Sequence, residues 1–156
     1  MSSTPSPEWP GRGDALAFAR LLLRRPGSVV EIRAPRVRRG HFTTNASGYF
    51  DDPAELVAAV ASIDGDAESI YITLNPVRRD LLARAANRLV LGAKQTTGDS
   101  DVVARRFLGL DFDPARPSGI SSSDEEKAAA HALANEVRVY LESVGFPDPI
   151  EGDSGN

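Results

Sequence analysis

Segments that favour β-strands alternate along this chain with segments that favour helices, and this alternation is the strongest constraint on its fold. Strand-like patterns occupy residues 28–34, 69–74 and 106–113, and a second, shorter strand follows the first one after a turn. Helical patterns occupy residues 14–25, 52–63, 79–91 and 123–144. This order excludes an all-helical or an all-β fold and predicts an α/β fold, arranged as an α+β sandwich.

Apolar and charged residues alternate within the first strand-like segment, SVVEIRA. Val30, Ile32 and Ala34 fall on one face of such a strand, and Glu31 and Arg33 fall on the other. The segment SIYITL carries little charge, which predicts a strand buried on both faces.

Two of the helical segments begin with clear capping signals. Asp52 is expected as an N-cap, with Glu55 placed to close a capping box. Ser122 or Ser123 is expected to cap the long C-terminal helix. Gly145 is suited to end that helix in a left-handed conformation.

Composition restricts the classes of protein to which the chain can belong. Its 156 residues, 41% hydrophobic and 26% charged, are typical of one soluble domain or part of one. The net charge of −4 gives no general attraction for nucleic acid, although arginines are concentrated in residues 20–39. The absence of cysteine excludes thiol catalysis and cysteine-bound zinc, and we expect a cytoplasmic location. No apolar run is long enough for a membrane span.

An acid pair follows the apolar run FLGL in the segment FLGLDFDPARP. On a strand, Asp111 and Asp113 point to the same side, with their Cα atoms about 6.5–7 Å apart. Two carboxylates at this range repel each other, and a divalent cation between them relieves the repulsion. The pattern therefore predicts Asp111 and Asp113 as metal ligands and catalytic residues.

Several ordered segments resemble the archaeo-eukaryotic primase superfamily, in particular the primase-polymerase domains of phages, plasmids and integrated elements. The likeness covers residues 28–156 and is carried by GYFDDPAELVAAV, YITLNPV, LLARAANRLV, TTGDSDVVARRFLGLDFDPARPSGISSSDEE and DSGN. It implies a DNA primase-polymerase that uses Mg²⁺ or Mn²⁺, with an RRM-like catalytic half. The serine and proline content of residues 1–12 predicts a disordered leader, and the resemblance implies that residues 13–156 are the N-terminal portion of the catalytic domain.

The resemblance assigns roles position by position. Asp111 and Asp113 match the first motif of the family, the metal-binding acid pair. Ser154, Gly155 and Asn156 match the stretch that leads into the second motif, which implies nucleotide binding. The histidine of that motif and a further acid have no matching position here, and neither His41 nor His131 corresponds to that histidine. The resemblance therefore implies an incomplete RRM-like half and an inactive fragment of a longer enzyme.

Five other residues are weaker candidates for contacts with substrates. Arg106 precedes the acid pair and is expected to reach nucleotide phosphates. Asn75, Arg84, Arg88 and Lys94 are candidates for contacts with nucleic acid. The partners implied are a DNA template and primer, (deoxy)nucleoside triphosphates and a downstream helicase domain or protein, without a membrane.

Other readings of the acid pair remain open. A phosphatase of the haloacid dehalogenase type also uses an apolar strand that ends in Asp-x-Asp. Such enzymes place Thr or Gly-Thr after the acid pair, where this chain has Pro114 and Ala115, and they need a later lysine and acids that have no clear counterpart here. Glycosyltransferases use Asp-x-Asp for a metal-bound nucleotide sugar. A non-catalytic module that binds nucleic acid is the alternative outside the enzymes.

Overall fold

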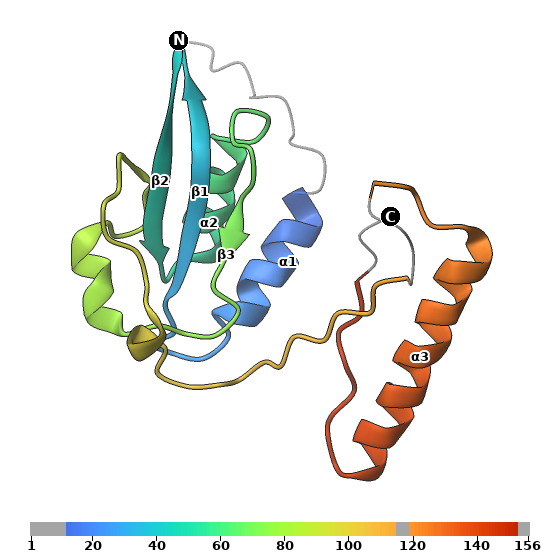
Figure 1. The fold of residues 1–156 in the computed structure, drawn as a ribbon. Coiled ribbons are helices and arrows are strands. Elements are labelled where there is room, and N and C mark those ends of the chain that lie inside the picture. Colours follow the sequence, from blue (N-terminus) through green and yellow to red (C-terminus); the bar gives the residue numbers. More distant parts are fainter. Residues whose placement is uncertain (1–11, 115–118, 153–156) are drawn as a thin grey trace. The chain divides into compact units, whose positions relative to one another are not determined.

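The computed structural model describes residues 12–114 and 119–152, and it divides into two compact units (Figure 1). The first, which we call the sheet unit, ends at Leu108, and the second, the helix unit, begins at Gly109. The leader expected over residues 1–12 lies outside the described residues, except for Arg12. Among the residues described, no helix is both long and apolar enough to cross a membrane.

The sheet unit is built on a four-stranded antiparallel sheet with the strand order β3-β1-β2-β4. The strands are β1 (Val30–Arg39), β2 (Phe42–Phe50), β3 (Tyr71–Ile72) and β4 (Val90–Leu91). The expected hairpin is confirmed as β1 and β2. The mixed α and β composition is confirmed too, whereas the primase-type fold stays a prediction.

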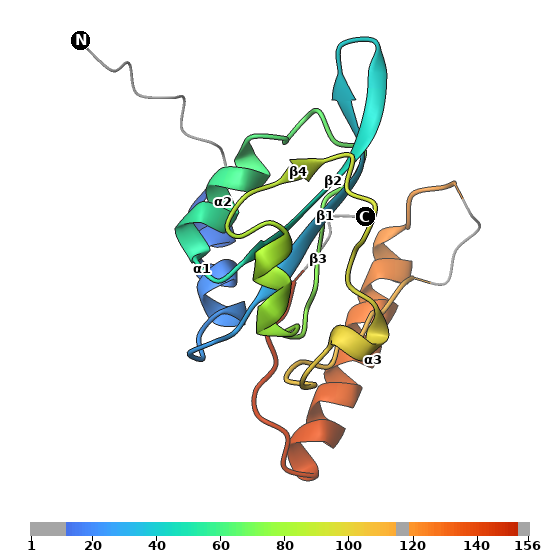
Figure 2. The ribbon, with the colours of Figure 1, turned by 90° about the vertical axis from the view of Figure 1, so that its left-hand side faces the viewer.

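The two faces of the sheet are covered by different elements (Figure 2). Helices α1 (Arg12–Leu22) and α2 (Pro53–Ala61) lie on one face, where Val30, Ile32 and Phe50 form a core with them. On the other face, Val29 and Tyr49 pack with residues of the segment that follows β3. The predicted alternation along β1 is therefore correct, because consecutive residues enter different cores.

The strand expected over residues 69–74 is wrong in its length and in its burial. Only Tyr71 and Ile72 are regular strand, and Tyr71 is 57% exposed at the edge of the sheet. The ladder ends because the hydroxyl oxygen of Thr73 accepts the hydrogen bond of the Glu31 N–H at 2.9 Å in place of a backbone carbonyl. Pro76 then lacks an N–H group for further pairing.

The helix expected over residues 79–91 is also wrong. A short 3₁₀-helix, η1, covers Arg79–Arg84 and then stops. Tyr49 of β2 competes for the backbone beyond it, because its N–H donates to the Ala85 carbonyl at 3.0 Å and its carbonyl accepts from the Asn87 N–H at 2.7 Å. Asn87 takes a positive φ of 49°, and the chain leaves this turn as β4.

The helix unit consists of α3 (Asp124–Ser143) and extended segments around it. Ser123 is the N-cap, one of the two serines expected there, and its reciprocal hydrogen bonds with Glu126 form a capping box. Gly145 has a φ of +90°, as expected for the residue that ends the helix. None of the described residues of α3 is buried, and the predicted apolar stripe includes Leu133 and Tyr140, which are 51% and 65% exposed.

Candidate functional site

The acid pair lies in a segment without regular secondary structure. The strand expected over residues 106–113 does not form, and Asp111 and Asp113 are both exposed. The segment has no hydrogen-bonded neighbouring strand among the four that make up the sheet. Strand alternation therefore does not hold the two carboxylates on one side. Over residues 12–114 and 119–152, no group of three or more acidic or histidine side chains is suited to hold a metal ion.

The chain just before the acid pair is firmly attached to the sheet unit through Asn75. The side-chain oxygen of Asn75 accepts hydrogen bonds from the backbone N–H groups of Arg106 and Phe107, at 2.6 and 2.9 Å. Its amide nitrogen donates to the Phe107 carbonyl at 3.1 Å. The guanidinium of Arg106 donates to the Ser28 hydroxyl at 2.6 Å, and Arg24 lies over the Phe107 ring, 5.8 Å from its centre.

The structure thus brings together two predicted ligand-binding residues, Asn75 and Arg106, but their side chains are engaged within the sheet unit. Asn75 holds the backbone of residues 106 and 107, and Arg106 donates to Ser28.

The other candidates lie elsewhere. Arg84 donates to the hydroxyl of Tyr49 at 3.4 Å. Arg88 lines a groove of about 360 Å³ between α2 and the segment that contains β4. Ser154, Gly155 and Asn156 lie outside the described residues. The roles assigned to these residues in binding nucleotide or nucleic acid stay predictions.

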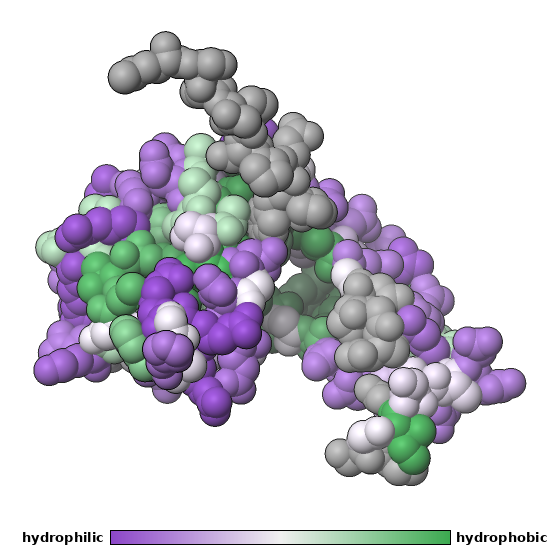
Figure 3. All heavy atoms as spheres, turned by 90° about the horizontal axis from the view of Figure 1, so that it is seen from above, coloured by the Kyte–Doolittle hydropathy of each residue, from purple (hydrophilic) through white to green (hydrophobic). Residues whose placement is uncertain are grey.

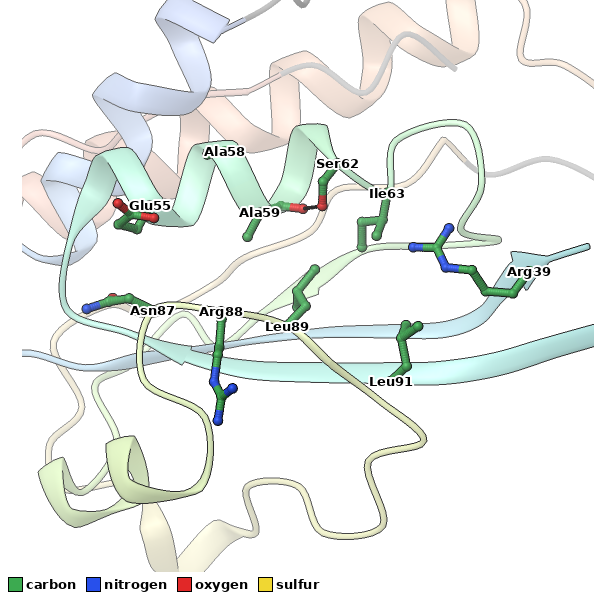
Figure 4. A pocket seen from close by; sticks show the side chains of 10 residues that line it. All are labelled: Arg39, Glu55, Ala58, Ala59, Ser62, Ile63, Asn87, Arg88, Leu89 and Leu91. Carbon is green, nitrogen blue, oxygen red and sulfur yellow. Dashed lines mark hydrogen bonds between the residues drawn. The ribbon is translucent and has the colours of Figure 1, made fainter.

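The groove beside Arg88 is mainly apolar (Figure 4). Leu89 and Leu91 point from the edge of the sheet towards α2, whereas the side chain of Arg88 points away from that helix. The carbonyl of Arg88 lies so close to β2 that a Cβ atom at Gly48 would be 2.0 Å from the carbonyl oxygen. Gly48 therefore permits the edge segment to approach the central strand.

At the C-terminal end of the arginine-rich segment, the arginines of residues 36–39 do not form an open basic patch, because acidic and carbonyl groups of residues 65–68 face them. Arg36 pairs with Glu68 at 2.8 Å and Arg39 pairs with Asp66 at 3.3 Å. Arg38 donates to the Gly65 carbonyl at 2.7 Å. Seen from above, hydrophilic surface alternates with exposed hydrophobic patches (Figure 3). A general affinity for polyanions does not follow from the arginine count.

A buried carboxylate occupies the face of the sheet opposite α1 and α2. The side chain of Glu31 is 0% exposed. It accepts hydrogen bonds from the Ser47 hydroxyl at 2.5 Å, from the Thr97 N–H at 3.0 Å and from Arg33 Nη2 at 3.0 Å. Arg33 Nη2 also donates to the Thr97 carbonyl at 3.0 Å. The alternation along β1 predicted which face Glu31 shares, but gave no sign that this carboxylate is buried.

The protonation state of Glu31 follows from these contacts. Burial by itself raises the pKa of the carboxyl, because a charge is costly away from water. The hydrogen bonds from Ser47, from the Thr97 backbone and from Arg33 oppose that effect, and the net result is a pKa below the ordinary value. Glu31 is therefore ionised at neutral pH, and it holds Thr97 against the sheet as a charged acceptor.

Residues 92–97, which we call the clamped loop, are fixed at both ends. At one end the Gly92 N–H donates to the Asn45 carbonyl at 2.7 Å, and at the other Thr97 is held by Glu31 and Arg33. Between these attachments, the predicted candidate Lys94 lines a hollow of about 260 Å³ together with Arg33 and Tyr71. Lys94 and Arg88 thus belong to different hollows.

Comparison of the chain with models of protein families, with curated proteins and with solved structures found no match.

Proposed function

We propose that this chain contains part of the catalytic machinery of a DNA primase-polymerase, in which Asp111 and Asp113 bind Mg²⁺ or Mn²⁺. The observation that carries the proposal is the state of this acid pair. Both carboxylates are exposed, and no ion pair involves either of them in the described ranges. Exposed carboxylates that are not engaged by a cationic side chain remain available as oxygen ligands for a divalent cation.

The attachment of residues 106 and 107 supports the same proposal. A metal centre needs ligands that enter from an ordered part of the chain. Asn75 makes three hydrogen bonds to Arg106 and Phe107, and these two residues shortly precede the acid pair in the sequence. We assign Asn75 as a positioning residue for this segment.

The proposed chemistry is transfer of a nucleotide to a primer or to an initiating nucleotide on a DNA template. Cations held by the acid pair would activate the attacking hydroxyl and stabilise the leaving pyrophosphate. The resemblance also implies a histidine that contacts phosphates and a third acid, for which this sequence has no matching position. We therefore expect the 156-residue chain alone to bind the metal weakly and to extend no primer.

Paramagnetic broadening by Mn²⁺ tests the metal site directly, because it detects weak binding through the backbone amide signals. The amides around Asp111 and Asp113 should broaden first, and the double variant D111N/D113N should abolish the effect. The chain contains an internal control with the same spacing, Asp99 and Asp101. Asp101 already contacts Arg78 and the Gly98 N–H, so the signals of this second pair should stay sharp.

Equal broadening at both pairs, or broadening near Asp111 that survives the double substitution, would contradict the metal site. Primer extension tests the activity in a longer protein that supplies the expected histidine. There, D111A/D113A should remove metal-dependent extension, and undiminished extension would refute the proposal. Extension by the 156-residue chain alone would refute the expectation that it is inactive.

A further inference from the structure

We propose that the hollow beside the clamped loop binds one nucleotide of a single-stranded nucleic acid, with a backbone phosphate at Arg33 and Lys94 and a base on the ring of Tyr71. The hollow has a volume of about 260 Å³, and Asn45 and Thr96 add polar groups to its lining. This inference deepens the proposed function. Only the identity of the bound strand, a template or a primer, rests on that function.

The sheet places the aromatic ring and the first cation side by side. Tyr71 of β3 and Arg33 of β1 are directly paired in the antiparallel register, and directly paired residues project to the same face. Because β3 is the edge strand, Tyr71 remains 57% exposed in spite of this pairing. An exposed ring beside a cation is the arrangement that proteins use to stack a base next to its phosphate.

The clamped loop supplies the second cation from a fixed backbone. Its attachments at Gly92 and Thr97 lie on either side of Lys94, so the loop is held at both ends while the lysine is exposed between them. Lys94 makes no ion pair within the described part of the chain. A lysine held in this way contacts a phosphate as a point charge.

The electrostatic balance of the hollow favours an anion. Glu31 is the nearest acid to Arg33 along β1, but its carboxylate is enclosed by Ser47 and Thr97 and does not line the hollow. Arg33 uses a single nitrogen, Nη2, for both Glu31 and the Thr97 carbonyl. Its remaining N–H groups can therefore serve a phosphate, and no acidic side chain of residues 12–114 or 119–152 lines the hollow.

Fluorescence anisotropy of a labelled oligothymidine of about twelve nucleotides tests the site. The titration is run in EDTA, so that no divalent cation at the acid pair contributes to the binding. Tyr71→Leu should weaken binding about fivefold or more through loss of stacking, whereas Tyr71→Phe should restore it. The matched control is Tyr140→Leu, which removes a similarly exposed tyrosine from α3 and should have no effect.

Salt dependence tests the phosphate contact separately. Between about 50 and 200 mM salt, Lys94→Gln should reduce the slope of log K against log salt by about 0.7, the value for one phosphate contact with a single strand. Arg20→Gln removes an exposed charge from α1, on the opposite face of the sheet, and should leave the slope unchanged. Lys94 lies in an exposed loop position, so this variant is expected to fold normally.

Undetectable binding of the unmodified chain at about 1 mM would overturn the proposal, since even non-specific binding is stronger than that. Equal affinity of Tyr71→Leu and the unmodified chain would overturn it too, as would an equal salt effect of Lys94→Gln and Arg20→Gln. Absence of Mn²⁺ broadening at the acid pair of the unmodified chain would instead refute the proposed function and leave this site standing.

Discussion

Replacement of Glu31 by glutamine tests whether a buried charge, rather than packing alone, holds the clamped loop on the sheet. Glutamine keeps the shape of the side chain but removes the charge and turns one acceptor oxygen into a donor. Ser47, Thr97 and Arg33 all donate to the carboxylate in the wild-type protein. The substitution therefore weakens or removes three charge-assisted hydrogen bonds.

The magnitude follows from the difference between charged and neutral hydrogen bonds. A bond to a charged group contributes about 1.5–3 kcal/mol and a neutral bond about 0.5–1.5 kcal/mol. Three bonds weakened by roughly 1 kcal/mol each would lower the free energy of unfolding by about 3 kcal/mol. The glutamine variant also avoids the cost of burying a charge, because the Glu31 side chain is 0% exposed, and this gain offsets part of the loss. We expect a net loss of about 2 kcal/mol at neutral pH.

The pH dependence separates the effect of the charge from that of the shape. Because the folded protein lowers the pKa of Glu31 below 4.5, the unfolded chain binds this proton more readily. The stabilisation is therefore fully present above the unfolded pKa and is lost as the pH falls through the folded pKa. The glutamine variant has no such proton, so the difference between the two proteins should narrow as the pH is lowered from about 7 to below 4.5.

Urea unfolding followed by NMR measures this difference in the sheet unit alone. The amide signals of β1 and of Thr97 report the unit, and the signals of α3 are left out of the fit. The midpoints and slopes for the wild type and for Glu31→Gln then give the change in free energy at each pH. A loss below about 0.5 kcal/mol at neutral pH, or a difference that widens on acidification, would refute the reasoning.

Two further substitutions test other contacts of the sheet unit. Gly48→Ala should destabilise it by about 1–3 kcal/mol or more, because the new Cβ would meet the Arg88 carbonyl oxygen at 2.0 Å. Gly98→Ala has no atom within 4 Å of its Cβ and serves as the matched control in the same urea titration. Asn75→Ala should increase hydrogen exchange at the Arg106 amide by about tenfold or more, and unchanged exchange would show that Asn75 does not hold this segment.

Patterns that depend on near neighbours in the sequence were enough to predict part of the fold. The alternation along β1 identified its two faces, since the period of a strand is a local property. Helix α3 begins after Ser123 and ends before Gly145 as expected, because the capping groups lie within a few residues of the helix ends. These elements needed no information about distant parts of the chain.

The failures share a dependence on distant partners. The helix expected beyond Arg84 does not form, because the backbone of Tyr49 in β2 forms hydrogen bonds with this segment instead. Residues 106–113, which contain the acid pair, have the alternating pattern of a strand but pair with none of the four strands of the sheet. The pattern itself does not reveal whether a neighbouring strand is present. The burial of Glu31 depends on Thr97, a residue far along the chain. None of these three outcomes is visible in a window of local sequence.

The attachment of Arg106 to Ser28 spans 78 residues, and this separation determines the order in which the sheet unit can assemble on the ribosome. The β1–β2 hairpin and α2 involve residues close in sequence and can form early in synthesis. Residues 24, 28 and 75 gain their partners only after Phe107 has emerged. A nascent chain stopped before that residue therefore carries an unfinished sheet unit, which remains vulnerable to proteases and to association with other chains until synthesis passes this point.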